Sequence, residues 1–396
     1  MNLIKDLNLT DEDVVSTKKL SLRGEKKVFN VYRIPINKLK YNKKNGRIAT
    51  YISQFIDEGH RFSDNLEEFN KIIEKFIEES NPDALKKTKL NIKALSQTEP
   101  AVVLSNGIIL DGNRRFTSLR QLSREGAGAE FNYLEAVILD SEKYNDKDIK
   151  RLELNLQHAI ESRVDYNPID RLVDVYRDLI ENGGIFTPEE YRGETQLSLN
   201  EVKKEIEIAN LLVEYLNFIN KPKKFYIARK QKVDGPLREI YKILKSSKVD
   251  EESKEDIKEY LFTNIMALDG DVTRRIRDLK GVFEDKELSE KLLEEIDEDE
   301  ILDDVTEYFE KIDKKSENVE LDEMLINKVK NLTENFVERK KYQNARNQPF
   351  DMLNRAYTTL EDIDKDALKR LDGLSKQKFE KLLDKVSKLV NELSDI

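Results

Sequence analysis

The segment that most constrains the fold is 101–122, with the sequence AVVLSNGIILDGNRRFTSLRQL. Two short apolar runs, Ala101–Leu104 and Ile108–Leu110, flank a Ser-Asn-Gly turn, and this pattern predicts a pair of β-strands. Gly112 then permits a sharp backbone turn, and Asn113 is a good N-cap for a helix with apolar residues every three or four positions. The segment therefore predicts strand, turn, strand, glycine corner and helix in immediate succession.

The start of this predicted helix carries the residues of an anion site. Unpaired N–H groups and the helix dipole favour negative charge at a helix N-terminus. Arg114 and Arg115 lie in the first turn, where their positive charge disfavours the helix itself. That cost favours a ligand-binding role for both arginines, with Gly112 and Asn113 beside them. The alternative is an ordinary strand–helix junction whose arginines make only structural contacts.

A second segment, 161–170 (ESRVDYNPID), begins another predicted helix, with Asn167 as its cap and Pro168 at its first position. The DGNRR sequence at 111–115 resembles the phosphate-binding box of the ParB/sulfiredoxin superfamily. Segment 161–170 resembles the second box of that family, and the matching residues are Arg163, Asp165, Asn167 and Pro168.

The resemblance implies an α+β fold, with a small ParB/sulfiredoxin-like mixed-sheet domain followed by a largely α-helical C-terminal half. It also implies a nucleoside triphosphate, CTP or ATP, bound with Mg²⁺. The Glu-Asn pair of the family members that hydrolyse nucleotides falls on Ala159 and Ile160 here, which argues against efficient hydrolysis. The nucleotide-binding residues implied by the resemblance are Gly112, Asn113, Arg114, Arg115, Arg163 and Asn167.

The residue types in the chain limit the chemistry. The sequence has no cysteine, which excludes thiol catalysis, disulfides and cysteine-bound metals. Asn113 stands where sulfiredoxins carry their reactive cysteine, so reductase activity is excluded. A second hypothesis is a metal-dependent nuclease or phosphotransferase of this fold, with Asp111 and Glu161 as catalytic carboxylates. A third is a non-catalytic interaction scaffold.

The chain is long enough for two or three domains. We expect a ParB/sulfiredoxin-like domain over 1–160 with a helical insertion near 50–90, a helical domain over 161–250 and a helical C-terminal domain over 251–396. Residues 1–26 are polar and are expected to form a loose leader before the first strand.

Residues 187–219 predict two helices at the place where a helix-turn-helix follows the second box in ParB proteins. The resemblance therefore implies DNA binding, and packing within a helical domain is the alternative. The expected connection, Tyr191–Leu197, is longer than a tight turn. Residues 221–248 contain ten Lys or Arg and two acidic residues, within a chain of net charge −10. The expected DNA-binding residues are Lys203, Lys204, Lys223, Lys224, Arg229, Lys230 and Lys232.

The last predicted helix carries apolar residues at alternating spacings of three and four, from Phe379 to Leu393. This pattern is typical of a dimerisation helix, which supports a homodimer, and of packing within the chain. The sequence contains no apolar run long enough for a membrane span and begins without a secretory signal pattern. We therefore expect a cytoplasmic protein.

Overall fold

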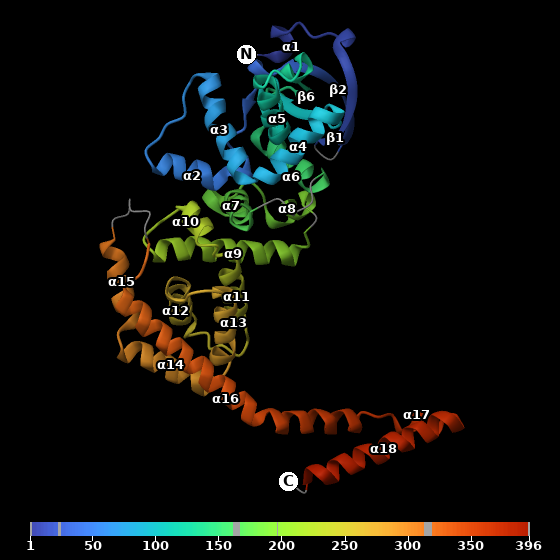
Figure 1. Cartoon of the computed structure of the whole chain (residues 1–396), viewed down its shortest axis with the longest axis vertical. Helices are drawn as coiled ribbons and strands as arrows, with labels where there is room; N and C mark the ends of the chain where they lie inside the picture. Colours follow the sequence, from blue (N-terminus) through green and yellow to red (C-terminus); the bar gives the residue numbers. More distant parts are fainter. Residues whose placement is uncertain (1, 23–24, 161–166, 196, 313–318, 395–396) are drawn as a thin grey trace. The chain divides into compact units, whose positions relative to one another are not determined.

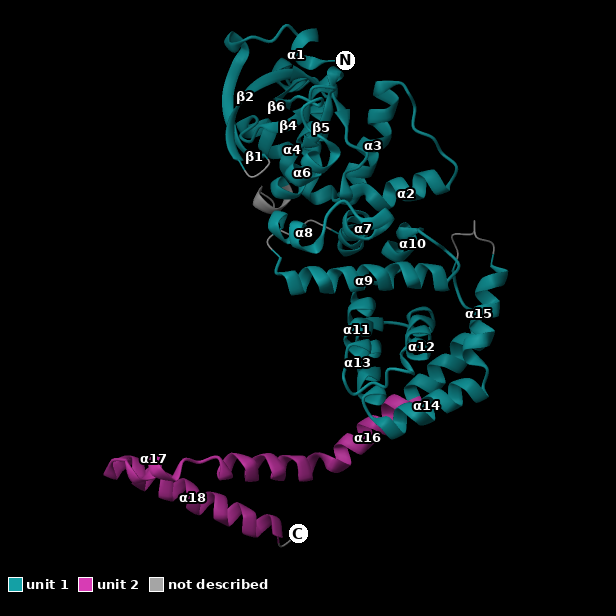
Figure 2. Cartoon of the chain, turned by 180° about the vertical axis from the view of Figure 1, so that it is seen from behind, with its two compact units in different colours: residues 1–334 teal, residues 335–396 magenta. Residues whose placement is uncertain are grey.

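The computed structural model describes the whole chain except residues 1, 23–24, 161–166, 196, 313–318 and 395–396. Its elements are drawn in Figure 1. The chain forms two compact units, residues 1–334 and 335–396 (Figure 2). The first holds a six-stranded mixed sheet and many helices, and the second is helical. The α+β prediction is confirmed.

The sheet lies in the N-terminal part of the first unit. Its strand order is β1-β2-β6-β4-β5-β3, with β4 parallel to β6, β3 parallel to β5 and the other neighbours antiparallel. The predicted strand–turn–strand segment forms β4 and β5, which are the fourth and fifth strands of this order. The strands are β1 (Val14–Leu22), β2 (Glu25–Pro35), β3 (Lys40–Tyr41), β4 (Ala101–Leu104), β5 (Ile108–Asp111) and β6 (Tyr133–Leu139).

The prediction of a loose leader over residues 1–26 is wrong. Strand β1 pairs antiparallel with β2 over nearly its whole length, from Val14 opposite Tyr32 to Leu22 opposite Glu25. Leu20 and Leu22 of β1 are buried in the core. The apolar–polar alternation at the end of β1 fits a sheet edge with one buried face. Lys18 and Lys19 make this segment polar, and for that reason the sequence did not predict a strand here.

The two faces of the sheet pack on different helices. Val103 and Ile109 point to one face, where they meet α5 (Asn113–Arg124) and α3 (Leu66–Ser80). Val102 and Leu110 point to the other face, where they meet α6 (Asp146–Ile160). This alternation follows from the two-residue period of a strand. The end of β5 and the start of α5 therefore lie between two helical layers.

The remaining helices complete both units. Helix α9 lies between α7 and α8 on one side and α11 and α12 on the other (Figure 1). In the described part of the chain, no helix combines the length and apolarity needed to cross a membrane. The helices are α1 (Leu3–Asp6), α2 (Ala49–Asp57), α4 (Pro82–Leu95), α7 (Pro168–Leu179), α8 (Pro188–Glu194), α9 (Leu199–Phe218), α10 (Phe225–Lys230), α11 (Asp234–Leu244), α12 (Lys254–Ala267), α13 (Val272–Phe283), α14 (Lys286–Glu298), α15 (Ile301–Lys311), α16 (Glu323–Glu361), α17 (Lys365–Lys369) and α18 (Gly373–Ser394).

Candidate functional site

The glycine corner that the sequence predicts is present. Strand β5 ends at Asp111, and Gly112 has φ of 101°, in the left-handed region that favours glycine. A Cβ atom at Gly112 would lie 2.7 Å from the Cβ of Ala101 on β4. Both the backbone angle and this close approach therefore require glycine. The corner places the N-terminus of α5 directly beside the end of the strand.

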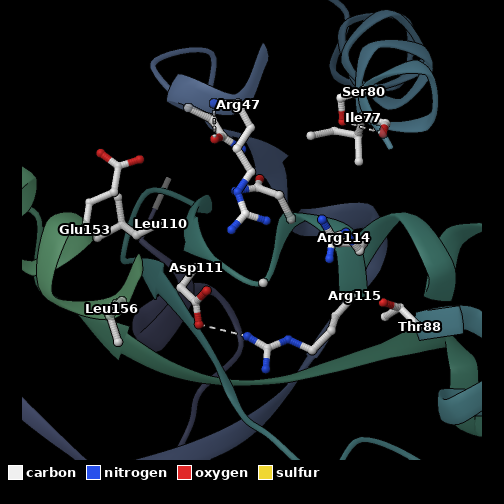
Figure 3. A pocket seen from close by; sticks show the side chains of 13 residues that line it. Arg47, Ile77, Ser80, Thr88, Leu110, Asp111, Arg114, Arg115, Glu153 and Leu156 are labelled. Carbon is white, nitrogen blue, oxygen red and sulfur yellow. Dashed lines mark hydrogen bonds and ion pairs between the residues drawn. The ribbon is translucent and has the colours of Figure 1, made fainter. Parts of the chain in front are cut away.

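A cavity of about 220 Å³ lies at this N-terminus (Figure 3). Its walls come from five parts of the first unit: the β5–α5 corner, the loop after β3, and helices α3, α4 and α6. The lining residues are Asn45, Arg47, Ile77, Ser80, Thr88, Leu110, Asp111, Gly112, Asn113, Arg114, Arg115, Glu153 and Leu156. The predicted box residues 111–115 thus share one cavity with residues far away in the sequence.

Asn113 is the polar side chain that most clearly lacks a partner in this wall. The residue is 8% exposed, and its Oδ1 atom is buried without a hydrogen-bond partner among the described residues. A buried amide without a hydrogen bond costs on the order of 1–3 kcal/mol. A ligand with a donor group, such as a hydroxyl, an amine or metal-bound water, satisfies this oxygen.

Three arginines line the cavity. Arg115 donates from Nη2 to Oδ2 of Asp111 at 2.8 Å and from Nη1 to the carbonyl oxygen of Glu99 at 2.9 Å. These contacts fix both Arg115 and Asp111 at the end of β5. Arg114 comes from the first turn of α5, and Arg47 comes from the 3-10 helix η3 (Gly46–Ile48). Figure 3 shows the guanidinium group of Arg47 extending toward the cavity from the opposite side.

Glu153 of α6 brings a second carboxylate to the cavity wall. The residue is 4% exposed, and burial raises the pKa of its carboxyl group to about 7, although Lys150 opposes that shift. The Lys150 ammonium lies 3.8 Å from one Glu153 oxygen, and the Asn42 amide donates to the other at 3.5 Å. A pKa near 7 is the value that suits a general acid or base at neutral pH.

Arg47 and Glu153 line the cavity but were not predicted from the sequence as site residues. Arg47 belongs to a basic, turn-rich loop over 40–47. The sequence of this loop does not indicate that it packs near the N-terminus of α5. Glu153 lies one turn from Ile149 and Leu156, on the apolar face of α6. A carboxylate at an inward position of an amphipathic helix was the signal that could have identified it.

The second box is described only in part. Glu161, Arg163 and Asp165 lie outside the described residues. Asn167 caps α7, because its Oδ1 accepts a hydrogen bond from the Ile169 N–H at 2.9 Å. Asn167 is not among the described residues that line the cavity, and its role toward a nucleotide stays a prediction.

The expected DNA-binding residue Arg229 joins distant parts of the first unit. Its Nη1 donates to Thr50 Oγ1 at 2.8 Å and to Asp170 Oδ2 at 3.0 Å, and its Nη2 donates to the Tyr51 hydroxyl at 2.8 Å. Asp170 is 1% exposed, and burial raises the pKa of its carboxyl group to about 6. Arg229 therefore provides the compensating charge for a buried acid.

The other expected DNA-binding residues differ in their surroundings. Lys224 forms an ion pair with Asp57 at 2.8 Å and is buried, and exposed Lys223 pairs with Glu181 at 2.7 Å. Lys204 is half-buried and lies 5.9 Å from the Tyr241 ring. The exposed lysines outside these pairs are Lys203, Lys230 and Lys232.

The candidate helix-turn-helix corresponds to α8 and α9, and their bounds correct the sequence analysis. Helix α8 extends to Glu194, so only residues 195–198 separate it from α9. Val202, Leu212 and Leu216 of α9 are buried, as its predicted apolar face requires. The short separation is compatible with a helix-turn-helix. The exposed residues of α9 are Asn200, Glu201, Lys203 and Asn217, so most of them lie at its N-terminal end.

The cavity offers few protein ligands for a metal. Among the described residues, no group of three or more His, Cys, Asp or Glu side chains is arranged to hold a metal ion. Mg²⁺ bound to a nucleotide needs only one or two protein carboxylates, since phosphates and waters supply the other ligands. Asp111 and Glu153 are the carboxylates that line the cavity.

No family model, curated protein or solved structure matches this chain.

Proposed function

We propose that the cavity binds the phosphate chain of a nucleoside triphosphate, CTP or ATP, and that the chain is a ParB-like, nucleotide-dependent DNA-binding protein. The observation that carries this proposal is the buried Oδ1 atom of Asn113, which has no hydrogen-bond partner among the described residues and lies at a helix N-terminus beside three arginines. The N–H groups of α5 and the arginine side chains suit phosphate oxygens. Asn113 suits a hydroxyl group or a metal-bound water of the same ligand.

The size of the cavity indicates which part of the nucleotide it holds. Sites that enclose a whole small molecule have volumes of about 300–1,000 Å³. The cavity here, at about 220 Å³, is smaller. We therefore assign the phosphate chain to the cavity and the nucleoside to its mouth. Asp111 and Glu153 would hold a Mg²⁺ ion carried in with the phosphates, and the ion would neutralise part of the phosphate charge.

Helix α6 supplies the physical connection between the cavity and the helical region. Glu153 and Leu156 of α6 line the cavity. Elsewhere on α6, Lys147 pairs with Glu190 of α8 at 2.8 Å and Arg151 pairs with Glu194 of α8 at 2.7 Å. A nucleotide that shifts α6 also moves α8, which precedes the expected DNA-reading helix. Nucleotide occupancy thereby acts as a switch for DNA contact through Lys203, Lys204 and the exposed lysines after α9.

Isothermal titration of the full chain with CTP, ATP and GTP, each with Mg²⁺, tests the proposal. Arg114→Ala should weaken binding roughly 10–100-fold, because one charge-assisted hydrogen bond contributes about 1.5–3 kcal/mol. Arg61→Ala, at an exposed arginine outside the cavity, is the matched control. The proposal fails if none of the three nucleotides binds, or if Arg114→Ala binds as tightly as the unmodified chain.

A gel-shift assay with duplex DNA, with and without the bound nucleotide, tests the DNA part separately. We expect the midpoint of the shift to change when nucleotide is added. Equal midpoints with and without nucleotide would reject the switch while leaving nucleotide binding intact.

The pKa of about 7 at Glu153 favours one second candidate, a metal-dependent nuclease or phosphotransferase. In that case Glu153 acts as general acid or base, and Asp111 assists the metal. Incubation of plasmid DNA with Mg²⁺ distinguishes the two candidates. Cleavage that is lost in both Asp111→Ala and Glu153→Gln supports the enzyme.

A further inference from the structure

The second unit, residues 335–396, exposes an apolar surface that is unusual for its size. None of its described residues after Phe336 is buried. Helix α16 exposes Phe350 (72%) and Tyr357 (62%), and α18 exposes Leu382 (61%). Within this unit the helices α16 and α18 therefore leave their apolar side chains uncovered. Single exposed apolar residues are ordinary, but a continuous stripe of them marks an interaction surface.

The spacing of these residues defines the kind of surface. In α16 the buried residues Leu325, Val329 and Leu332 follow steps of four and three, and the same steps recur at the exposed residues 350, 353, 357 and 360. In α18 the steps run through 379, 382, 386, 389 and 393. Leu383 and Val390 widen the α18 stripe by one position per heptad. Such a wide stripe is typical of a bundle helix, which contacts two neighbours.

We propose that a second copy of this chain covers these stripes, so that α16 and α18 of two copies form a four-helix bundle. Nine of the large apolar side chains on these stripes are exposed in each copy. At roughly 80–100 Å² each, they provide about 800 Å² per copy, which is close to the area that a stable interface takes from each partner.

The charge pattern favours a second copy over an anionic membrane. Residues 350–372 carry four Lys or Arg and six acidic residues, whereas residues 373–394 carry five Lys and three acidic residues. The two helical segments thus have opposite net charge, and α18 of one copy complements the 350–372 segment of the other. A helix that lies on anionic lipids is instead flanked by basic residues with few acids.

Light scattering after size-exclusion chromatography of the full chain tests the proposal. The expected mass is about 93 kDa, twice the 46.3 kDa of one chain. The double variant Leu382→Glu with Leu389→Glu places two carboxylates on the stripe and should weaken the dimer roughly a hundredfold or more. Both leucines are exposed in the single chain, so its helix content by circular dichroism should not change.

The matched control adds the same two charges on the opposite side of α18, as Gln377→Glu with Asn391→Glu, and should remain a dimer. A mass of 46 kDa for the unmodified chain at tens of micromolar overturns the proposal, as does a dimer that survives in the stripe variant. A monomer that instead floats with phosphatidylserine vesicles overturns it in favour of a membrane surface. These outcomes are independent of nucleotide binding.

Discussion

The carboxyl group of Glu153 offers a direct measure of the electrostatics of the cavity wall. Burial raises its pKa to about 7, and Lys150 lowers it only in part. The pKa of the same group in the unfolded chain is close to 4.5. Between these two pH values the folded state holds a proton that the unfolded state has lost. The free energy of unfolding therefore falls as pH rises through this window.

The magnitude follows from the two pKa values. One pKa unit corresponds to about 1.4 kcal/mol, so ionised Glu153 lowers the stability of the folded chain by up to about 3 kcal/mol above pH 7. Glutamine has nearly the same shape and does not titrate. Glu153→Gln should therefore match the unmodified chain in stability near pH 4.5 and exceed it by up to about 3 kcal/mol at pH 8.

Urea unfolding of the ligand-free chain, followed by circular dichroism between pH 5 and pH 8, measures this difference. Glu298→Gln, at an exposed acid of α14, is the control and should show a difference close to zero at every pH. A stability difference between Glu153→Gln and the unmodified chain that stays the same from pH 5 to pH 8 would show that the pKa of Glu153 is not raised.

Two further predictions concern the corner and the basic stretch. Gly112→Ala should lower the free energy of unfolding by about 2–4 kcal/mol, because the new Cβ atom clashes with Ala101 and a positive φ is costly for alanine. The control is Gly59→Ala, where φ is also positive but the space is open, so urea unfolding should show a loss of only about 1–2 kcal/mol. Arg229→Met should cost about 3–5 kcal/mol, because it leaves a buried carboxylate without its partner. Lys230→Met, at the exposed neighbour, should change stability by less than about 0.5 kcal/mol in the same assay, and equal losses in the two variants would contradict the structural role of Arg229.

The parts of the fold that the sequence predicted are those determined by neighbouring residues. The succession β4, β5, Gly112 and α5 depends on a turn, a glycine and a helical apolar pattern within 22 residues. The predicted N-cap is wrong, because Gly112 occupies that position and Asn113 is the first residue of the helix. Strand β1 was not predicted, because Lys18 and Lys19 interrupt its apolar–polar alternation. Its strand structure becomes evident only from its pairing with β2. Only the wall formed by residues 111–115 could be predicted, because Arg47 and Glu153 are 65 and 41 residues away from Gly112 in the sequence.

The basic stretch shows why a charge count cannot by itself assign a binding surface. Residues 221–248 have a large positive excess in sequence, but the compensating acids come from elsewhere: Asp57 for Lys224, Asp170 for Arg229 and Glu205 for Arg238. These pairs hold α10 and α11 to α2, α7 and α9, so much of the apparent DNA-binding charge stabilises the fold. The Asn113 side chain differs in kind, because no described residue satisfies its buried oxygen. A polar group that folding leaves without a partner is stronger evidence for a ligand than a positive charge that folding has already neutralised.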